Sequence, residues 1–101
     1  MPQVLVSSAC VEFRETLARH IKELSRADPE RHSVEWFFLR YLRRVAKRAE
    51  ATAKASEVSA AIRGLMRFYV DSIAANSALT ERFEDVLAAH RHALRAEHSP
   101  Q

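Results

Sequence analysis

Apolar side chains recur at intervals of three and four residues along most of this chain, which is the spacing that lines one face of an α-helix. The pattern predicts four helices. Their apolar series are Cys10, Phe13, Leu17, Ile21 and Leu24; Val34, Phe38, Tyr41 and Val45; Val58, Ile62, Leu65, Tyr69 and Ile73; and Leu79, Phe83, Val86, Leu87, His90 and Leu94. Met66 and Val70 are expected to widen the third apolar face.

Polar residues mark the ends of these segments. Ser7 or Ser8 is the expected N-cap of the first helix, because a serine hydroxyl can accept a hydrogen bond from a first-turn amide. The first pattern breaks near Ser25, and Asp28-Pro29-Glu30 is typical of a cap, a first helical residue and an acidic first turn. The second helix is therefore expected to begin there or at Ser33.

Four amphipathic segments with short connections predict an all-α protein, a small four-helix bundle with up-down-up-down topology. The length is that of one domain, so we expect a single helical domain over residues 1–101, with flexible ends at 1–6 and 97–101. The stretch from Ala49 to Ser56 leaves an alternative open, because its Ala, Glu and Lys residues are good helix formers. The second and third helices could then fuse into a three-helix arrangement, which would expose a flank and favour a dimer.

Composition supports a helical, globular chain. With 48% apolar and 29% charged residues it can form a core, and one glycine and three prolines are too few turn residues for a sheet fold. Cys10 is the only cysteine, which excludes an internal disulfide and a cysteine zinc cluster within one chain. No apolar stretch is long enough for a signal peptide or membrane span. We therefore expect a cytoplasmic protein that does not bind membranes.

The second predicted helix is apolar over much of its circumference. Consecutive helical residues point about 100° apart, so the run Trp36-Phe37-Phe38 cannot face one narrow core. A thick core is one interpretation; the other is an aromatic anchor for a second chain, since Trp and Tyr are favoured at interface centres. On that interpretation the protein is a non-enzymatic interaction or regulatory protein that binds another protein or itself, as a homo-oligomer. The predicted partner-binding residues are Trp36, Phe37, Tyr41, Arg40 and Arg44.

The same helix carries a basic stripe with no acid before Glu50. The stripe consists of Arg40, Arg43, Arg44, Lys47 and Arg48. It could neutralise phosphates, with Arg63 and Arg67 extending it, which makes a nucleic-acid-binding accessory protein the alternative function. It could equally be a solvated face whose charges pair with Glu35, Glu50 or acids on neighbouring helices. The modest net charge of +3 weighs against nucleic acid.

Neither catalysis nor metal binding is predicted. The chain shows no nucleophile with a base and an orienting group, and no phosphate-binding glycine loop, so we expect no enzyme and no cofactor. His90 and His92 are two residues apart and point to different helix faces, so no metal site is expected. His90 and Cys10 lie on apolar faces, where a hydrogen-bonded histidine and a buried thiol are the ordinary outcomes. His20 is expected at an exposed or edge position.

Overall fold

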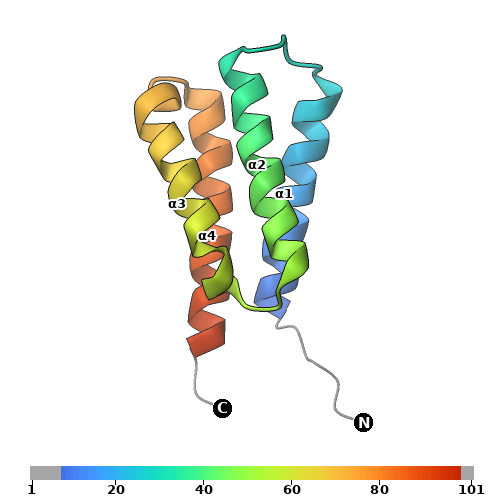
Figure 1. The fold of residues 1–101 in the computed structure, drawn as a ribbon, viewed down its shortest axis with the longest axis vertical. Coiled ribbons are helices and arrows are strands. Elements are labelled where there is room, and N and C mark those ends of the chain that lie inside the picture. Colours follow the sequence, from blue (N-terminus) through green and yellow to red (C-terminus); the bar gives the residue numbers. More distant parts are fainter. Residues whose placement is uncertain (1–7, 99–101) are drawn as a thin grey trace.

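The computed structural model describes residues 8–98. Its four main helices are α1 (Ser8–Arg26), α2 (Val34–Ala51), α3 (Ser59–Phe68) and α4 (Ser77–His98). A 3₁₀ helix, η1 (Ala55–Val58), precedes α3, and a π-helical turn, η2 (Tyr69–Ile73), follows it. The helices run alternately up and down, with α1 packed against α2 and α4, and α2 packed against α3 (Figure 1). The predicted all-α four-helix bundle is confirmed.

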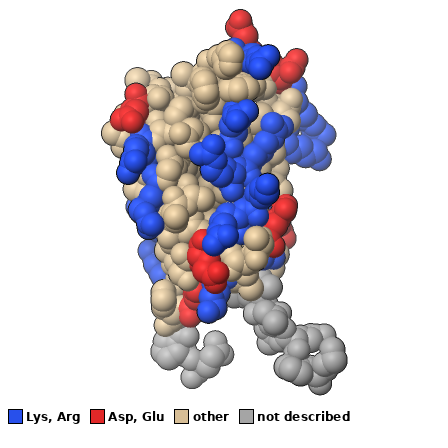
Figure 2. All heavy atoms as spheres, in the orientation of Figure 1, with Lys and Arg blue, Asp and Glu red and all other residues tan. Residues whose placement is uncertain are grey.

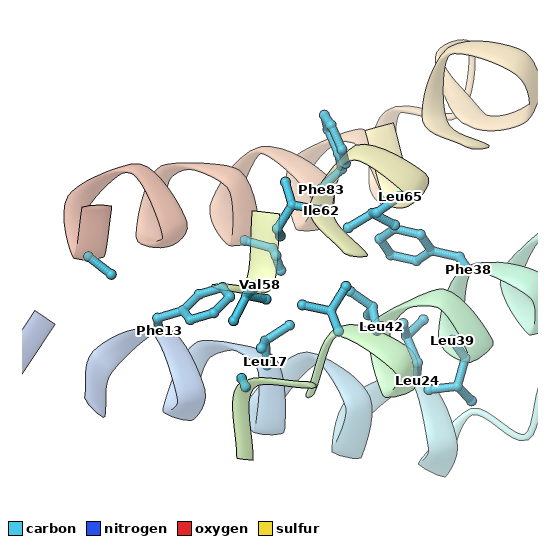
Figure 3. Close-up of a cluster of buried hydrophobic side chains, with 14 of the residues drawn as sticks. Phe13, Leu17, Leu24, Phe38, Leu39, Leu42, Val58, Ile62, Leu65 and Phe83 are labelled. Carbon is cyan, nitrogen blue, oxygen red and sulfur yellow. The ribbon is translucent and has the colours of Figure 1, made fainter. Parts of the chain in front are cut away.

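Apart from Val34, which is 36% exposed, the predicted apolar series fill the interior of the bundle or pack against it, where side chains from all four helices meet (Figure 3). The largest side chains that are almost completely buried are Phe13, Phe38, Leu17, Leu42, Leu65, Ile73, Val45, Val58 and Val86. Complete burial of one such side chain contributes roughly 1.5–3 kcal/mol. Met66 and Val70 were expected on the apolar face of the third helix, but they are 40% and 70% exposed. That expectation was wrong, because α3 buries a narrower stripe than its apolar residues cover.

The end of α1 and the start of α2 are distinct structures. Ser33 caps α2, because its hydroxyl accepts a hydrogen bond from the Trp36 amide at 3.2 Å. Asp28 does not cap α2: it has a φ of 48° and its amide bonds to the Ser25 carbonyl, so it ends α1 in the left-handed conformation that Asp tolerates. Of the two predicted starts, Ser33 is right. Ser8 is the first residue of α1, and Ser7 lies outside the described residues.

Helix α2 ends at Ala51 and does not fuse with α3. The guanidinium of Arg14, on α1, donates hydrogen bonds to the Ala49 carbonyl at 3.2 Å and the Thr52 carbonyl at 2.8 Å. The last carbonyls of a helix lack partners within the helix, and Arg14 supplies donors for two of them. The thiol of buried Cys10, also on α1, lies 3.7 Å from the Ala53 carbonyl.

Helix α4 holds the other side of this connection. The buried ring of His90 donates from Nε2 to the Ala55 carbonyl at 2.9 Å, as expected for a hydrogen-bonded histidine on an apolar face. The Glu97 carboxylate accepts hydrogen bonds from the Ser56 amide and hydroxyl, at 2.9 and 2.7 Å. These contacts replace the helical hydrogen bonds that a fused helix would make. Of the ends expected to be flexible, Glu97 and His98 belong to α4, and residues 1–6 and 99–101 lie outside the described part.

Within residues 8–98, no helix has both the length and the apolar character required to cross a membrane.

Candidate functional site

The outward side of α2 carries a continuous basic surface. The predicted stripe residues are all exposed there: Arg40, Arg43, Arg44, Lys47 and Arg48. Figure 2 shows Lys and Arg side chains gathered over α2, in a band that follows the helix. We call these five residues, together with Trp36 and Phe37 near the start of the helix, the α2 face.

None of the five basic side chains contacts a carboxylate of the described residues 8–98. Arg43 donates to the Ser25 hydroxyl at 3.0 Å, and Arg48 donates from Nε to the backbone carbonyl of Glu57 at 3.2 Å. Both acceptors are neutral, so neither hydrogen bond pairs its arginine with a negative charge. Within residues 8–98, the stripe forms no ion pair with Glu35, Glu50 or an acid of a neighbouring helix.

Two arginines of the α2 face lie over aromatic rings. The guanidinium carbon of Arg40 is 4.9 Å from the centroid of the Trp36 ring, and that of Arg44 is 5.1 Å from the Tyr41 ring. Such cation–π contacts contribute about 0.5–1 kcal/mol at exposed sites. These contacts restrict the positions of the two guanidinium groups but do not neutralise their positive charges, which stay exposed to solvent.

The aromatic residues of α2 have different roles. The Tyr41 ring is half-buried and stacks on Phe68 of α3, with 4.7 Å between centroids and 20° between planes. It therefore fastens α2 to α3. Trp36 is half-buried and Phe37 is 38% exposed. The structure thus places Trp36, Phe37, Arg40 and Arg44 on the α2 face, and Tyr41 in the contact between helices.

A groove of about 460 Å³ runs beside the α2 face, between α2 and the start of α3. Its lining residues are Arg44, Lys47, Arg48, Ala51, Glu57, Ala60 and Ala61. The basic side chains stand on the α2 side, and alanines form much of the rest. Exposed Arg63 and Arg67 lie on α3, and in Figure 2 uncharged surface separates the α2 band from Lys and Arg at the α3 edge. Exposed basic side chains therefore lie on both α2 and α3, in two separate bands.

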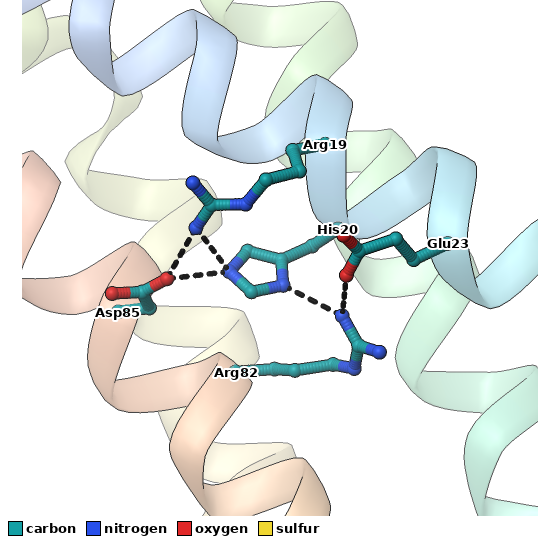
Figure 4. Close-up of polar contacts among 5 residues, drawn as sticks. All are labelled: Arg19, His20, Glu23, Arg82 and Asp85. Carbon is teal, nitrogen blue, oxygen red and sulfur yellow. Dashed lines mark hydrogen bonds and ion pairs between the residues drawn. The ribbon is translucent and has the colours of Figure 1, made fainter.

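The α1–α4 side has the opposite character (Figure 4). Arg82 of α4 contacts Glu23 and His20 of α1, at 2.6 and 2.9 Å. Asp85 of α4 contacts His20 at 2.8 Å and also pairs with Arg19. His20 is only 5% exposed, so its expected edge position was wrong: charged groups of α4 close over it. We call these five residues the α1–α4 network.

Both ring nitrogens of His20 have partners in the α1–α4 network. A guanidinium has no acceptor, so Arg82 donates to Nδ1. Nε2 lies 2.8 Å from the Asp85 carboxylate and 3.3 Å from the Arg19 guanidinium, and we place the ring proton on Nε2 because its shorter contact is with the acceptor. The hydrogen bond from Arg82 also lowers the pKa of Glu23 below its ordinary value, and the charge of Arg82 adds to this effect. Each charge in this network faces an opposite one, which suits it to structural support.

The described residues contain no cluster of metal ligands. No group of three or more His, Cys, Asp or Glu side chains in residues 8–98 is arranged to hold a metal ion. Cys10 is 5% exposed and packs within the bundle, as expected for a small buried thiol. The α2 face is therefore the candidate functional site.

In comparisons with known proteins, no family model, no curated protein and no solved structure matches this chain. The argument for function consequently depends on the chemistry of the α2 face.

Proposed function

We propose that this protein is a non-enzymatic nucleic-acid-binding accessory protein whose α2 face holds phosphate groups. The observation that carries the proposal is the set of five exposed basic side chains that meet no carboxylate in residues 8–98. Phosphates suit such a row, because arginine can bind them through two parallel N–H groups. The net charge of the whole protein understates the positive charge of α2, because charges are unevenly distributed among the helices. Helix α2 has five basic and two acidic residues, whereas α4 has three basic and four acidic.

A second candidate is protein binding through the same face, as the aromatic residues predict. Its support is the exposure of Phe37 and the half-burial of Trp36 beside Arg40, since aromatic residues and arginine are enriched where proteins bind one another. Self-association by a two-fold axis is less suited to this face. Such an axis would oppose each basic row to its own copy, and like charges in contact cost several kcal/mol. An acidic partner protein fits better.

One preparation can separate these candidates. The protein is run on a sizing column with light scattering, while absorbance is recorded at 260 and 280 nm, first at 50 mM and then at 500 mM salt. A proposed phosphate-binding face predicts a monomer that carries 260-nm material at low salt and loses it at high salt. A protein that is free of nucleic acid at both salt concentrations would favour the second candidate, and a dimer would show that the chain also associates with itself.

Charge reversal provides the direct test. In Arg43→Glu/Arg44→Glu/Lys47→Glu, we expect the affinity for a fluorescein-labelled oligonucleotide to fall at least a hundredfold at 50 mM salt, because three phosphate contacts become repulsive. Arg91→Glu is the matched single control, since Arg91 is exposed on α4 and outside the α2 face. The loss of oligonucleotide affinity in Arg91→Glu is compared with the loss in the single variant Arg44→Glu. Equal losses in these two single variants would mean that net charge, and not the α2 face, governs binding.

A further inference from the structure

Three aromatic rings form a cluster at the start of α2, next to the basic row. The His32 ring lies edge-on to Trp36 at 5.0 Å and nearly parallel to Phe37 at 6.0 Å, with 24° between the latter planes. Trp36 and Phe37 meet edge-to-face at 4.9 Å. Arg40 extends the cluster by lying over Trp36. We call His32, Trp36 and Phe37 the aromatic platform.

The aromatic platform is maintained at some conformational cost and is open to solvent. His32 has a φ of 69°, in the left-handed region that favours glycine, yet this position carries a ring that packs on two others. His32 is exposed, and Phe37 is 38% exposed, whereas the bundle buries Phe13 and Phe38 completely. A preformed set of rings, two of them exposed and one half-buried, lies beside a basic row, and proteins that bind single strands combine aromatic side chains with a basic surface in this way.

We infer that the α2 face binds a single-stranded nucleic acid, with bases stacked on the aromatic platform and phosphates along Arg40, Arg44 and Lys47. This inference rests on the proposed function and adds the strand type and the stacking site. A helix rises 1.5 Å per residue, so these three basic residues are separated along α2 by about 6 and 4.5 Å. The basic row therefore starts one helical turn beyond Trp36 and continues without interruption away from the rings.

The shape of the bundle argues against recognition of a duplex. Helix α2 lies between α1 and α3, and the molecule measures 23 by 18 Å across its long axis. The major groove of B-DNA is about 12 Å wide and admits a single helix. With neighbours on both sides, α2 cannot enter it and could touch only the outer phosphates. A flexible single strand can instead lie on the α2 face and turn its bases to the rings.

Fluorescence anisotropy with labelled 12-nucleotide oligo(U) and oligo(dT), and with a 12-base-pair duplex, tests this inference. Each probe is titrated with the full chain at 50 and 200 mM salt. The informative variants are Phe37→Ala and His32→Gly, since glycine adopts the φ of position 32 without strain and removes only the ring. Val70→Ala is the control, because Val70 is 70% exposed and lies on η2, outside the α2 face. Circular dichroism establishes that each variant is folded.

We expect either single strand to bind more tightly than the duplex, and each ring variant to weaken single-strand binding about tenfold. The salt dependence should stay unchanged in the ring variants, because they remove no phosphate contact, and Val70→Ala should bind like the parent. Equal affinity for single strand and duplex, no effect of the ring variants, or equally tight binding of poly-glutamate would overturn the inference. Absence of salt-dependent binding to every nucleic-acid probe would instead overturn the proposed function itself.

Discussion

The two sides of this bundle use charge in opposite ways. On the α1–α4 side, Arg82 and Asp85 reach across to His20 and Glu23, and every charge of the network meets an opposite one. On the α2 face, arginines lie over aromatic rings or donate to neutral oxygens, and none forms an ion pair with a carboxylate of residues 8–98. Charge on the first side fastens helices together, whereas charge on the second stays exposed to solvent. The same residue type therefore joins two helices in one place and forms a surface patch in the other.

The sharpest way to break this comparison is to reverse one charge on each side. Arg82→Glu should lower the free energy of unfolding by about 2–3 kcal/mol, because it leaves the buried Nδ1 of His20 without a donor and faces Glu23 with a like charge. Lys47→Glu, on the α2 face, removes no cation–π contact and should change it by less than about 0.5 kcal/mol. Urea unfolding at pH 7 measures both. Equal losses would mean that the α2 face is also structural.

Acid should weaken the α1–α4 side selectively. The pKa of Glu23 is lowered by its hydrogen bond from Arg82. For Glu97, desolvation raises the pKa, but two hydrogen bonds from Ser56, together with nearby positive charges, outweigh it and lower the pKa below its ordinary value. A depressed folded-state pKa gives stability that is present above the ordinary value of 4.5 and is lost as the pH falls through the lower value. Unfolding free energy should therefore fall between pH 5 and about pH 3.

Glutamine variants identify the groups responsible. Glu23→Gln and Glu97→Gln should each flatten the dependence of stability on pH in that window, because neither amide titrates. Glu35→Gln, on α2, is the control and should leave the dependence as it is in the parent. If Glu35→Gln flattened the dependence of stability on pH as much as Glu23→Gln and Glu97→Gln do, Glu23 and Glu97 would not be the groups responsible for the acid sensitivity.

The smallest expected effect is a gain in stability on the α2–α3 side. A Cβ built on Gly64 would lie 4.0 Å from the Tyr41 ring, which is ordinary van der Waals contact. Alanine is favoured over glycine in a helix by about 1 kcal/mol, so Gly64→Ala should raise the unfolding free energy by up to that amount. Oligonucleotide affinity should stay the same, because Gly64 is outside the α2 face. A loss of stability would show that Tyr41 and Phe68 need the space.

The helices themselves were predictable from the sequence, because burial follows the three-and-four spacing directly. The errors arose where distant residues decide the outcome. Asp28 has the local chemistry of an N-cap, but Ser33 competes successfully for that role. The expectation for His20 came from its neighbours on α1, whereas Arg82 and Asp85, more than 60 residues away, close over it. The opposite charges on α1 and α4 were compatible with this contact, but helical periodicity describes one segment at a time and does not show which segments pair.

The structure of the connection between α2 and α3 is also decided by residues that are distant in the sequence. Ala49 to Ser56 has good helix formers, yet the backbone leaves the helix at Thr52 with a φ of −143°. Arg14, from α1, and Glu97, from α4, bond to the backbone there. Intrinsic propensity is worth a few tenths of a kcal/mol per residue, which such tertiary hydrogen bonds exceed.

For the candidate site, the residue types were recognisable but their partners were not. The basic stripe and the aromatic run were visible as patterns in the second helix. Two outcomes depend on how α2 is rotated in the bundle: Tyr41 stacks on Phe68, and the five basic side chains meet no carboxylate in the described part. His32 was missed because it precedes α2 with a φ of 69°, so no helical spacing connects it with Trp36.

An even number of alternating helices places the start of α1 and the end of α4 at the same end of the bundle, and the aromatic platform at the other (Figure 1). Helix α2 has 18 residues, so about 27 Å of helix separates the two ends. A tether attached at either of those helix ends would leave the rings unobstructed. The protein could thus be immobilised on a surface, or joined to another domain, with its aromatic platform facing outward.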